Sequence, residues 1–380
     1  MASPDIIVIG AGIVGCAIAR ELQGRGYQVM VLERAQPGAE ASSVAAGILA
    51  PAVEHASDPI LFELGRKSQQ IHQSLAEELG NECKVDVGFR RKGALVVFFE
   101  TNELLSPPEH FDSMGVRVEP CSPQEIQHLE PAVSDQVIGA LFFPDESQVE
   151  AGCLLQALLA SAKKRGVLIR QASVRRLLVQ KGKIHGVECE LERVYAPHVV
   201  IAAGAWSSLI VPDEPALGLP LIRPVRGQLV HARGEIGLVR HIVFGKGVYI
   251  VPRDDGRIVC GATVEEAGFD RQPTLGGIAQ VMSRALGLIP CLSSTEFFGH
   301  GVSFRPATID GRPLIGPSEI QGLWIASGHY RNGILWSPIT AQIIADLIEG
   351  RTPSLSPELL AAISPQRPMV KAQIGSSPHS

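Results

Sequence analysis

The sequence Ile6-Ile-Val-Ile-Gly-Ala-Gly-Ile-Val-Gly15 decides the fold of this 380-residue chain. A short β-branched run over residues 6–9 leads into three glycines with the spacing G-x-G-x-x-G. Such a run predicts a buried parallel strand. From Ile13 onward the apolar residues repeat with a helical period, and Gly24 ends the predicted helix. A second buried strand, Gln28–Leu32, completes a βαβ unit within about 30 residues.

Each glycine of this unit has a physical reason to be glycine. Gly10 permits the tight turn from strand to helix, Gly12 lets the backbone approach a pyrophosphate, and Gly15 lets helix and strand pack closely. The helix N-terminus offers free N–H groups and a partial positive charge to phosphates. Glu33 ends the second strand, where its carboxylate can bind both ribose hydroxyls and would repel the 2′-phosphate of NADP. The unit predicts a dinucleotide site but does not separate NAD from FAD.

Segments of two kinds alternate along the rest of the chain. One kind, typical of a parallel sheet with covering helices, comprises helix Cys153–Arg165, strand Val167–Ile169 and strand Val199–Ala203. The other kind, typical of an antiparallel sheet, comprises strands Ala94–Glu100, Leu229–Ala232, Val248–Val251 and Arg257–Cys260, with helix Leu275–Leu288 among them. The alternation predicts an α/β fold of two discontinuous domains threaded through each other.

The predicted nucleotide domain is a Rossmann-type domain with a parallel sheet, over residues 1–88, 146–220 and 306–364. It is interleaved with a predicted α+β substrate domain built on an antiparallel sheet, over residues 89–145 and 221–305. The Pro- and Ser-rich residues 365–380 are predicted to form a disordered tail.

Composition excludes several classes of protein. The chain is 45% apolar and 19% charged, with a net charge of −5 and no dense basic run, which argues against nucleic-acid and anionic-membrane partners. No apolar run approaches the roughly 18 residues of a membrane span. The N-terminus has no positive charge before its short apolar run, so we expect no signal peptide and a cytoplasmic protein. The seven cysteines are dispersed, and neither a disulfide nor a metal site is predicted.

The segment Ala41-Ser-Ser-Val-Ala-Ala-Gly-Ile-Leu-Ala50 follows the ribose-binding acid closely. One interpretation is a small-residue helix start capped by Ser42 or Ser43. The other is a second set of hydroxyl and N–H donors to the pyrophosphate, with Ala46–Ile48 passing beside a flat ring. The proximity to Glu33 favours the second interpretation.

A second segment of interest, Ser327-Gly-His-Tyr-Arg-Asn-Gly-Ile-Leu-Trp-Ser-Pro338, lies near the C-terminus. Pro338 is expected just inside the start of an apolar helix, Ile339–Ile348, which is the preferred position for proline. The N–H groups of such a helix start could stabilise negative charge on a reduced isoalloxazine ring. In isolation an ordinary capped helix is the better interpretation, and together with the glycine motif the segment indicates a flavoenzyme.

Two residues suit a substrate carboxylate. Arg305, in Gly301-Val-Ser-Phe-Arg-Pro306, has a guanidinium that can bind a carboxylate bidentately, and the phenol of Tyr249 can bind its second oxygen. The alternatives are a structural salt bridge and a half-buried core tyrosine. From the residues alone these alternatives are favoured.

The combined motifs resemble the D-amino-acid-oxidase-like flavoproteins and, among them, the glycine oxidases. The resemblance extends to about residue 364. It rests on Ile9-Gly-Ala-Gly-Ile-Val-Gly15, Ala41-Ser-Ser-Val-Ala-Ala-Gly47, Ala203-Gly-Ala-Trp-Ser207, Tyr249-Ile-Val-Pro-Arg253, Cys260-Gly-Ala-Thr263, Phe304-Arg-Pro306 and Gly328-His-Tyr-Arg-Asn-Gly-Ile334.

The resemblance implies non-covalent FAD, a homotetramer, and a substrate carboxylate bound by Arg305 and Arg331 with Tyr249 alongside. It implies cofactor contacts from Ile13, Val14, Glu33, Arg34, Ala41, Ser42, Ala46, Gly47, Ile48, Val174, His329, Tyr330, Arg331, Asn332, Gly333, Ile334 and Leu335, to which we add the motif residues Gly10, Gly12, Gly15, Ser43 and Gly204.

Three positions bear on how far the family pattern holds. Ser303 stands where related sarcosine oxidases carry a cysteine bound covalently to the flavin, so no covalent link is expected. Ile48 replaces a methionine and Gly247 replaces a histidine of the family pattern. Both are expected near the active-site entrance, so substrate preference is less determined than reaction type.

The activity implied is oxidative deamination of glycine, sarcosine and small D-amino acids by hydride transfer to flavin N5, yielding H2O2 and an imine that serves thiamine synthesis. Arg305 would hold the Cα–H within roughly 3–3.5 Å of N5. No residue is assigned as acid or base. The alternatives are an FAD dehydrogenase that uses another electron acceptor, the flavin domain of a tRNA-modifying enzyme, and a non-catalytic or NAD-binding module.

Overall fold

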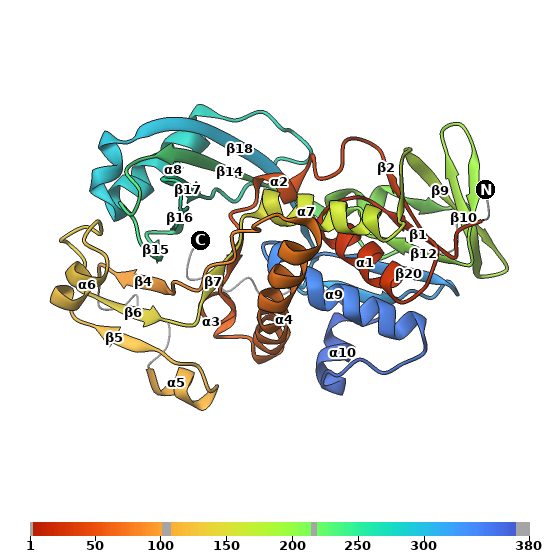
Figure 1. Ribbon diagram of the computed structural model, residues 1–380, viewed down its shortest axis with the longest axis horizontal. Helices are drawn as coiled ribbons and strands as arrows, with labels where there is room; N and C mark the ends of the chain where they lie inside the picture. The colour runs from red at the N-terminus through yellow and green to blue at the C-terminus, as the bar shows by residue number, and fades with distance from the viewer. Residues whose placement is uncertain (1–2, 101–107, 214–218, 370–380) are drawn as a thin grey trace.

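The computed structural model describes residues 3–100, 108–213 and 219–369, and it contains two large β-sheets. Figure 1 shows the six-stranded sheet at the right and the eight-stranded sheet at the left, with α4 (Pro59–Cys83) and α7 (Ala151–Lys164) between them. The six-stranded sheet has the order β19 (Leu314–Pro317), β20 (Leu323–Ser327), β12 (His198–Ile201), β1 (Ile6–Ile9), β2 (Val29–Glu33), β8 (Leu168–Gln171). All its neighbours are parallel except β19 and β20.

Alternate residues of β1 face two different cores. Ile6 and Val8 pack against α1 (Ile13–Gly24), α7 and α9 (Gly333–Ile348). Ile7 and Ile9 face a small second sheet on the other side. Because the sheet is covered on both faces, its central strands are apolar throughout. The covering sheet has the order β11 (Arg193–Tyr195), β10 (Lys183–Cys189), β9 (Val174–Gln180), β13 (Val211–Pro212).

The eight-stranded sheet is antiparallel except where β15 and β4 run parallel. Its order is β18 (Glu296–Ala307), β14 (Arg223–Arg233), β17 (Arg257–Gly261), β16 (Val248–Pro252), β15 (Ile242–Gly245), β4 (Ala94–Phe98), β6 (Gly139–Phe143), β5 (Glu119–Cys121). The core on one face includes α8 (Leu275–Leu288) and α6 (Pro123–Leu129). The core on the other face includes α3 (Pro51–His55).

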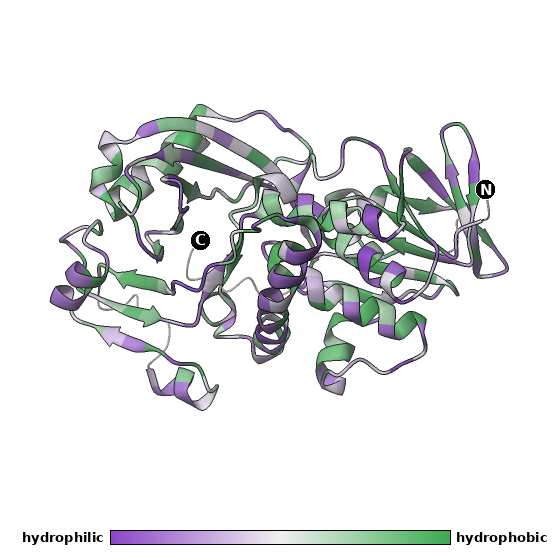
Figure 2. Cartoon of the chain, in the orientation of Figure 1, coloured by the Kyte–Doolittle hydropathy of each residue, from purple (hydrophilic) through white to green (hydrophobic). Residues whose placement is uncertain are grey.

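The remaining elements are short. They are α2 (Ala41–Val44), the two-stranded pair β3 (Ile48–Leu49) and β7 (Ser147–Gln148), α5 (Pro108–Ser113), α10 (Pro357–Ile363) and the 3-10 helices η2 (Gly204–Leu209) and η3 (Pro290–Ser294). In Figure 2 the visible side of α4 is hydrophilic, whereas its buried residues, including Leu64 and Leu79, pack into the core.

The predicted fold class is confirmed, with small shifts in the bounds of elements. Helix Leu275–Leu288 is found as predicted, and α7 begins two residues before the predicted start at Cys153. Strand Ala94–Glu100 ends earlier, at Phe98. The four predicted antiparallel strands lie in one sheet, which also contains the unpredicted strand β15, parallel to β4. The division of the chain into domains stays a prediction.

The predicted position of Pro338 is wrong. The helix α9 begins at Gly333, so Pro338 lies inside it and not at its start. A proline removes the N–H that would bind the carbonyl four residues earlier, here Ile334. That carbonyl instead lies 2.9 Å from Ser337 Oγ and 3.2 Å from His72 Nε2. These side-chain partners allow the helix to continue through the proline.

Further predictions concern the C-terminal tail, the cysteines, metal sites and membrane spans. Most of the predicted tail, 370–380, lies outside them, whereas Arg367 is described and pairs with Asp310 at 2.7 Å. The seven cysteines have free thiols. Over residues 3–100, 108–213 and 219–369, no three His, Cys, Asp or Glu side chains lie together as metal ligands, and no helix could cross a bilayer.

A buried carboxyl group attaches α3 to its surroundings. Glu146 is 3% exposed; its Oε1 accepts from the Ala52 N–H at 2.9 Å, and its Oε2 accepts from Gln69 Nε2 at 2.7 Å. Burial raises the pKa of Glu146 from 4.5 to about 8, because ionisation would place a charge in an apolar environment. Stabilisation by the neutral carboxyl is complete below pH 4.5 and is lost as the pH rises through about 8.

We expect Glu146→Gln to remove this pH dependence. The variant should gain melting temperature relative to the natural protein as the pH rises from about 6 to about 9, since each unit of pKa shift is worth about 1.4 kcal/mol. Thermal unfolding of the FAD-loaded protein across this range measures the difference. A difference that does not change with pH would contradict the prediction.

Candidate functional site

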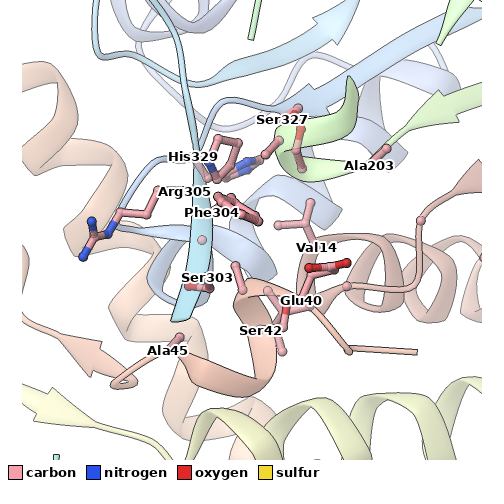
Figure 3. A pocket seen from close by; sticks show the side chains of 18 of the residues that line it. Val14, Glu40, Ser42, Ala45, Ala203, Ser303, Phe304, Arg305, Ser327 and His329 are labelled. Carbon is pink, nitrogen blue, oxygen red and sulfur yellow. Dashed lines mark hydrogen bonds between the residues drawn. The ribbon is translucent and has the colours of Figure 1, made fainter. Parts of the chain in front are cut away.

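A cavity of about 340 Å³ lies between the two large sheets. One wall consists of the carboxyl ends of β1, β2, β12 and β20, which is where ligands bind in open parallel sheets. The other wall consists of residues of β14, β16 and β18. Figure 3 shows Phe304 and Arg305 projecting to opposite sides of β18, Phe304 toward Val14 and Arg305 away from it.

The glycine motif forms the turn that was predicted. Gly10 has a φ of +105°, and a Cβ there would lie 2.6 Å from the Ala202 carbonyl oxygen. A Cβ at Gly15 would lie 2.0 Å from the Gly10 oxygen, so the helix reaches the strand only because this residue is glycine. Gly12 is the N-cap residue of α1, has no side chain of its own to cap the helix, and lines the cavity.

Two side chains bond to the backbone of this turn. Glu33 Oε2 accepts from the Ala11 N–H at 2.7 Å, and Ser42 Oγ accepts from the Ile13 N–H at 2.9 Å. Ser42 therefore caps α1. The helix α2 has no side-chain cap, so the interpretation that Ser42 or Ser43 caps α2 is wrong. Ser43 is exposed and donates to the Glu40 carbonyl at 3.0 Å.

The C-terminal segment meets the glycine motif at the same cavity. The Tyr330 N–H donates to the Pro306 carbonyl at 2.8 Å, and Tyr330 has a φ of +47°. His329 is buried, which lowers its pKa to about 3 and keeps the imidazole neutral; its Nε2 lies 3.0 Å from Thr340 Oγ1. The start of α9, Gly333 and Ile334, lines the cavity.

The predicted carboxylate-binding residues Tyr249, Arg305 and Arg331 come together at one end of the cavity. Glu54, which was not predicted, lies with them, and we call these four residues the arginine chamber. Arg305 Nη1 donates to the Thr263 carbonyl at 2.9 Å. Burial lowers the pKa of Arg305 and raises the pKa of Tyr249. The phenol therefore stays protonated at neutral pH.

Two glycines make room for these side chains. A Cβ at Gly227, on β14, would lie 2.5 Å from Arg305 Nη2. A Cβ at Gly261, on β17, would lie 2.5 Å from the Tyr249 Oη. The absence of both side chains allows the guanidinium and the phenol to lie over the sheet.

Most predicted site residues line the cavity. They are Gly10, Gly12, Ile13, Val14, Glu33, Arg34, Ala41, Ser42, Ala46, Gly47, Ile48, Val174, Gly204, Tyr249, Arg305, His329, Tyr330, Arg331, Gly333 and Ile334. The residues Gly15, Ser43, Asn332 and Leu335 do not line it. Of the two departures from the family pattern, Ile48 lines the cavity and Gly247 does not.

Sequence reasoning missed three residues near this cavity. Trp206, which lines it, lies under the Arg34 guanidinium at 4.0 Å. Glu54, on α3, faces Arg331 with 3.8 Å between Oε1 and Nη2. Arg253 is 8% exposed and donates to the carbonyls of Ala46 and Val149. The available signal was a charge within an apolar segment, since Glu54 follows Pro51-Ala-Val53 and Arg253 ends Tyr249-Ile-Val-Pro-Arg253.

Comparisons with known proteins agree with this site. A family model described as FAD dependent oxidoreductase matches residues 5–347. Glycine oxidase from Geobacillus kaustophilus is 33% identical over 352 residues, 91% of this chain and 93% of that protein. The bifunctional protein ThiO/ThiG from Trichormus variabilis is 35% identical over 359 residues, 90% of this chain and 52% of that protein. The chain therefore spans about half the length of the bifunctional relatives that it matches.

Solved structures show the same fold. The crystal structure of glycine oxidase from Geobacillus kaustophilus has a TM-score of 0.91 and 32% identity, and the match covers 97% of this chain and 100% of that one. Iminodiacetate oxidase from Chelativorans sp. BNC1 has a TM-score of 0.86 and 27% identity, covering 96% and 100%. The chain belongs to the family of FAD-dependent oxidoreductases, and FAD is its cofactor.

The residues of the cavity fit this cofactor. Gly10 and Gly12 expose backbone at the N-terminus of α1, as a pyrophosphate requires, and Glu33 at the end of β2 suits a ribose. The family decides between NAD and FAD, which the glycine motif alone left open. The assignment of individual residues to FAD stays a prediction.

Arg253 gives a test of how the cofactor loop is held. Arg253→Met should raise the dissociation constant for FAD by about ten- to a hundredfold, since loss of charged hydrogen bonds to buried carbonyls costs about 1.5–3 kcal/mol. Titration of the apoprotein with FAD, followed by flavin fluorescence, measures this constant.

Arg257→Met is the matched control. Arg257 pairs with Glu150 at 2.9 Å, as Arg253 does at 3.5 Å, but it has no bond to Ala46 or Val149. Equal FAD affinity in the two variants would show that Arg253 does not hold the loop.

Proposed function

We propose that this chain oxidises glycine and other small amino acids, such as sarcosine and small D-amino acids, with FAD as the acceptor of the hydride. The products would be the imine, which hydrolyses to the 2-oxo acid and ammonia, or methylamine in the case of sarcosine, and H2O2 formed from O2. The similarity to glycine oxidases over more than nine-tenths of the chain supports this reaction.

One observation carries the proposal: Arg305 lines the cavity between the two large sheets and forms no salt bridge with any described residue. A buried cation without a carboxylate partner is costly unless a ligand supplies the opposite charge. A guanidinium suits a carboxylate because it can donate two parallel hydrogen bonds. The small carboxylate-bearing substrate of an amino-acid oxidase fits this requirement.

The residues of the chamber would bind and orient such a substrate. Arg305 would hold the carboxylate, and the Tyr249 phenol, which stays protonated because burial raises its pKa, would donate to it. When bound, FAD supplies the hydride acceptor and passes the electrons to O2. His329 is neutral, with its pKa lowered to about 3, so it adds no charge to the wall beside the cofactor loop.

No residue of the chamber needs to act as a base if the amine binds in its neutral form. The substrate would then lose a hydride from Cα and, as the imine forms, a proton from nitrogen to water.

Several finer features belong to the same proposal. We infer a non-covalent flavin, since Ser303 lines the cavity and no cysteine is among the described residues that line it. A role in thiamine synthesis is supported by the relatives named ThiO/ThiG. A homotetramer is a further part of the proposal that rests on the family resemblance alone, and a cytoplasmic location is a further part that rests on the N-terminal sequence.

An FAD dehydrogenase with another electron acceptor is the alternative. Anaerobic bleaching of the flavin by a panel of amino acids tests the substrate, and it precedes any question about the acceptor. Peroxide production in air, compared with reduction of a dye, then separates oxidase from dehydrogenase. If glycine, sarcosine and small D-amino acids all fail to bleach the flavin, both the oxidase and the dehydrogenase would be rejected.

We expect Arg305→Ala to raise the KM for glycine strongly and to lower kcat, because the substrate loses both charge pairing and orientation. The loss of kcat/KM should be on the order of a hundredfold or more, as for truncation of one partner of a buried charge pair. Steady-state peroxide production measures it. Near-normal turnover of glycine would reject the assignment.

Gly227→Ala tests the same site without removing a charge. The new methyl group should displace the Arg305 guanidinium, so KM should rise while FAD content stays that of the natural protein. Gly276→Ala, on α8 with no atom within 4 Å of the new Cβ, is the control. Unchanged KM values in both variants would mean that Arg305 is not held where the structure has it.

A further inference from the structure

Glu54 is a carboxylate that the binding of a simple amino acid does not require. It lies on α3, lines the cavity, and has an 11% exposed side chain. Its Oε1 is 3.8 Å from Arg331 Nη2, and this is the only salt bridge of Arg331 among the residues that the structure describes. At this distance the attraction is electrostatic, without a hydrogen bond to fix it.

The position of Glu54 is set by its neighbours on α3. The preceding turn is tied to Glu146 through the Ala52 N–H at 2.9 Å. The following residue, His55, stacks on Trp336 of α9, with 5.3 Å between ring centroids. These contacts hold the carboxylate at the chamber, so its charge is a fixed part of the site.

The formal charges of the arginine chamber add up to one positive charge. Arg305 and Arg331 are two cations, Glu54 is one anion, and Tyr249 is neutral at ordinary pH. The other charged residues that line the cavity belong to the glycine-motif end. There Glu33 accepts from the Ala11 N–H at 2.7 Å.

The last two charged residues of the cavity lining neutralise each other. Arg34 pairs with Glu40 at 2.7 Å, and Glu40 also contacts Arg271. The glycine-motif end therefore keeps the negative charge of Glu33, and the chamber is the part of the cavity with a net positive charge. One substrate carboxylate, on a substrate whose amine is neutral, balances it.

A second carboxylate would meet a different environment. Its natural partner would be Arg331, which Glu54 already pairs with. It would also lie near the Glu54 carboxylate, and two like charges in a buried site repel each other.

We propose that Glu54 sets the charge selectivity of the site: by pairing with Arg331, it restricts the chamber to substrates with one carboxylate and rejects those with two. This inference rests on the proposed function. It makes Glu54 a specificity-determining residue and defines the substrate class as small amino monocarboxylates.

The test compares two substrates that differ by one carboxylate. Sarcosine is a secondary amine with one carboxylate, and iminodiacetate is a secondary amine with two. The ratio of kcat/KM for iminodiacetate to that for sarcosine is measured with the FAD-loaded natural protein and with Glu54→Gln. The isosteric change should raise the ratio at least about tenfold, as expected for the removal of one repulsive buried charge. An unchanged or lower ratio would overturn the proposal.

Glu40→Gln is the matched control, because it removes the same charge from the same cavity at its other end. Its ratio should stay that of the natural protein. A ratio raised equally by Glu40→Gln would show that only the total charge matters, which also contradicts a specific role for Glu54.

Binding of unreactive ligands separates this inference from the proposed function. Methoxyacetate and diglycolate, the ether analogues of the two substrates, are titrated against the flavin absorbance. Glu54→Gln should improve diglycolate binding relative to methoxyacetate even if neither amine is oxidised, and that result would leave the inference standing while the function fails. If the natural protein oxidises sarcosine but Glu54→Gln leaves the ligand selectivity unchanged, the proposed function stands and the inference about Glu54 fails. If Glu54→Gln does not retain FAD, Glu54→Ala takes its place with the same expected direction.

Discussion

The close contact between β1 and the start of α1 is the constraint on which the rest of the structure depends. The Gly10 carbonyl lies where a Cβ of Gly15 would be, so strand and helix approach to backbone distance. This contact points the helix N-terminus at the carboxyl edge of the sheet, where its free N–H groups suit phosphate oxygens. Glu33 and Ser42 then bond to the same turn and bring β2 and α2 to it.

The chamber depends on the second sheet in a similar way. Arg305 and Tyr249 extend over strands whose facing residues are glycines, so two bulky polar groups reach one space without displacing the backbone. Long charged side chains in such a place need partners. The structure provides a carboxylate for Arg331, whereas Arg305 donates to a backbone carbonyl. Arg305 is therefore the stronger anion site of the two.

Local patterns predicted much of this fold, because the βαβ unit is encoded within a few dozen consecutive residues. The sheet membership of segments was harder, as the parallel β15–β4 pair shows. Pro338 was placed wrongly since the donors that replace its N–H include His72, more than 260 positions earlier. Arg253 and Glu54 were missed for the same reason: Arg253 acts on Ala46, 207 positions away, and no local pattern reports such a contact. The predicted roles of Arg305 and Tyr249 came from family resemblance, not from their neighbours in sequence.

The order of strands in the six-stranded sheet has a consequence for biosynthesis. β1 lies beside β12, β12 lies beside β20, and α1 packs against α9, so the first and last thirds of the chain build one core. A nascent chain that has emerged from the ribosome only as far as β12 has the glycine turn but lacks the α9 wall of its cavity. Since such distant pairings form late, flavin loading is expected to follow the emergence of α9. The apolar surfaces of β1 and α1 must therefore stay protected during translation until α9 covers them.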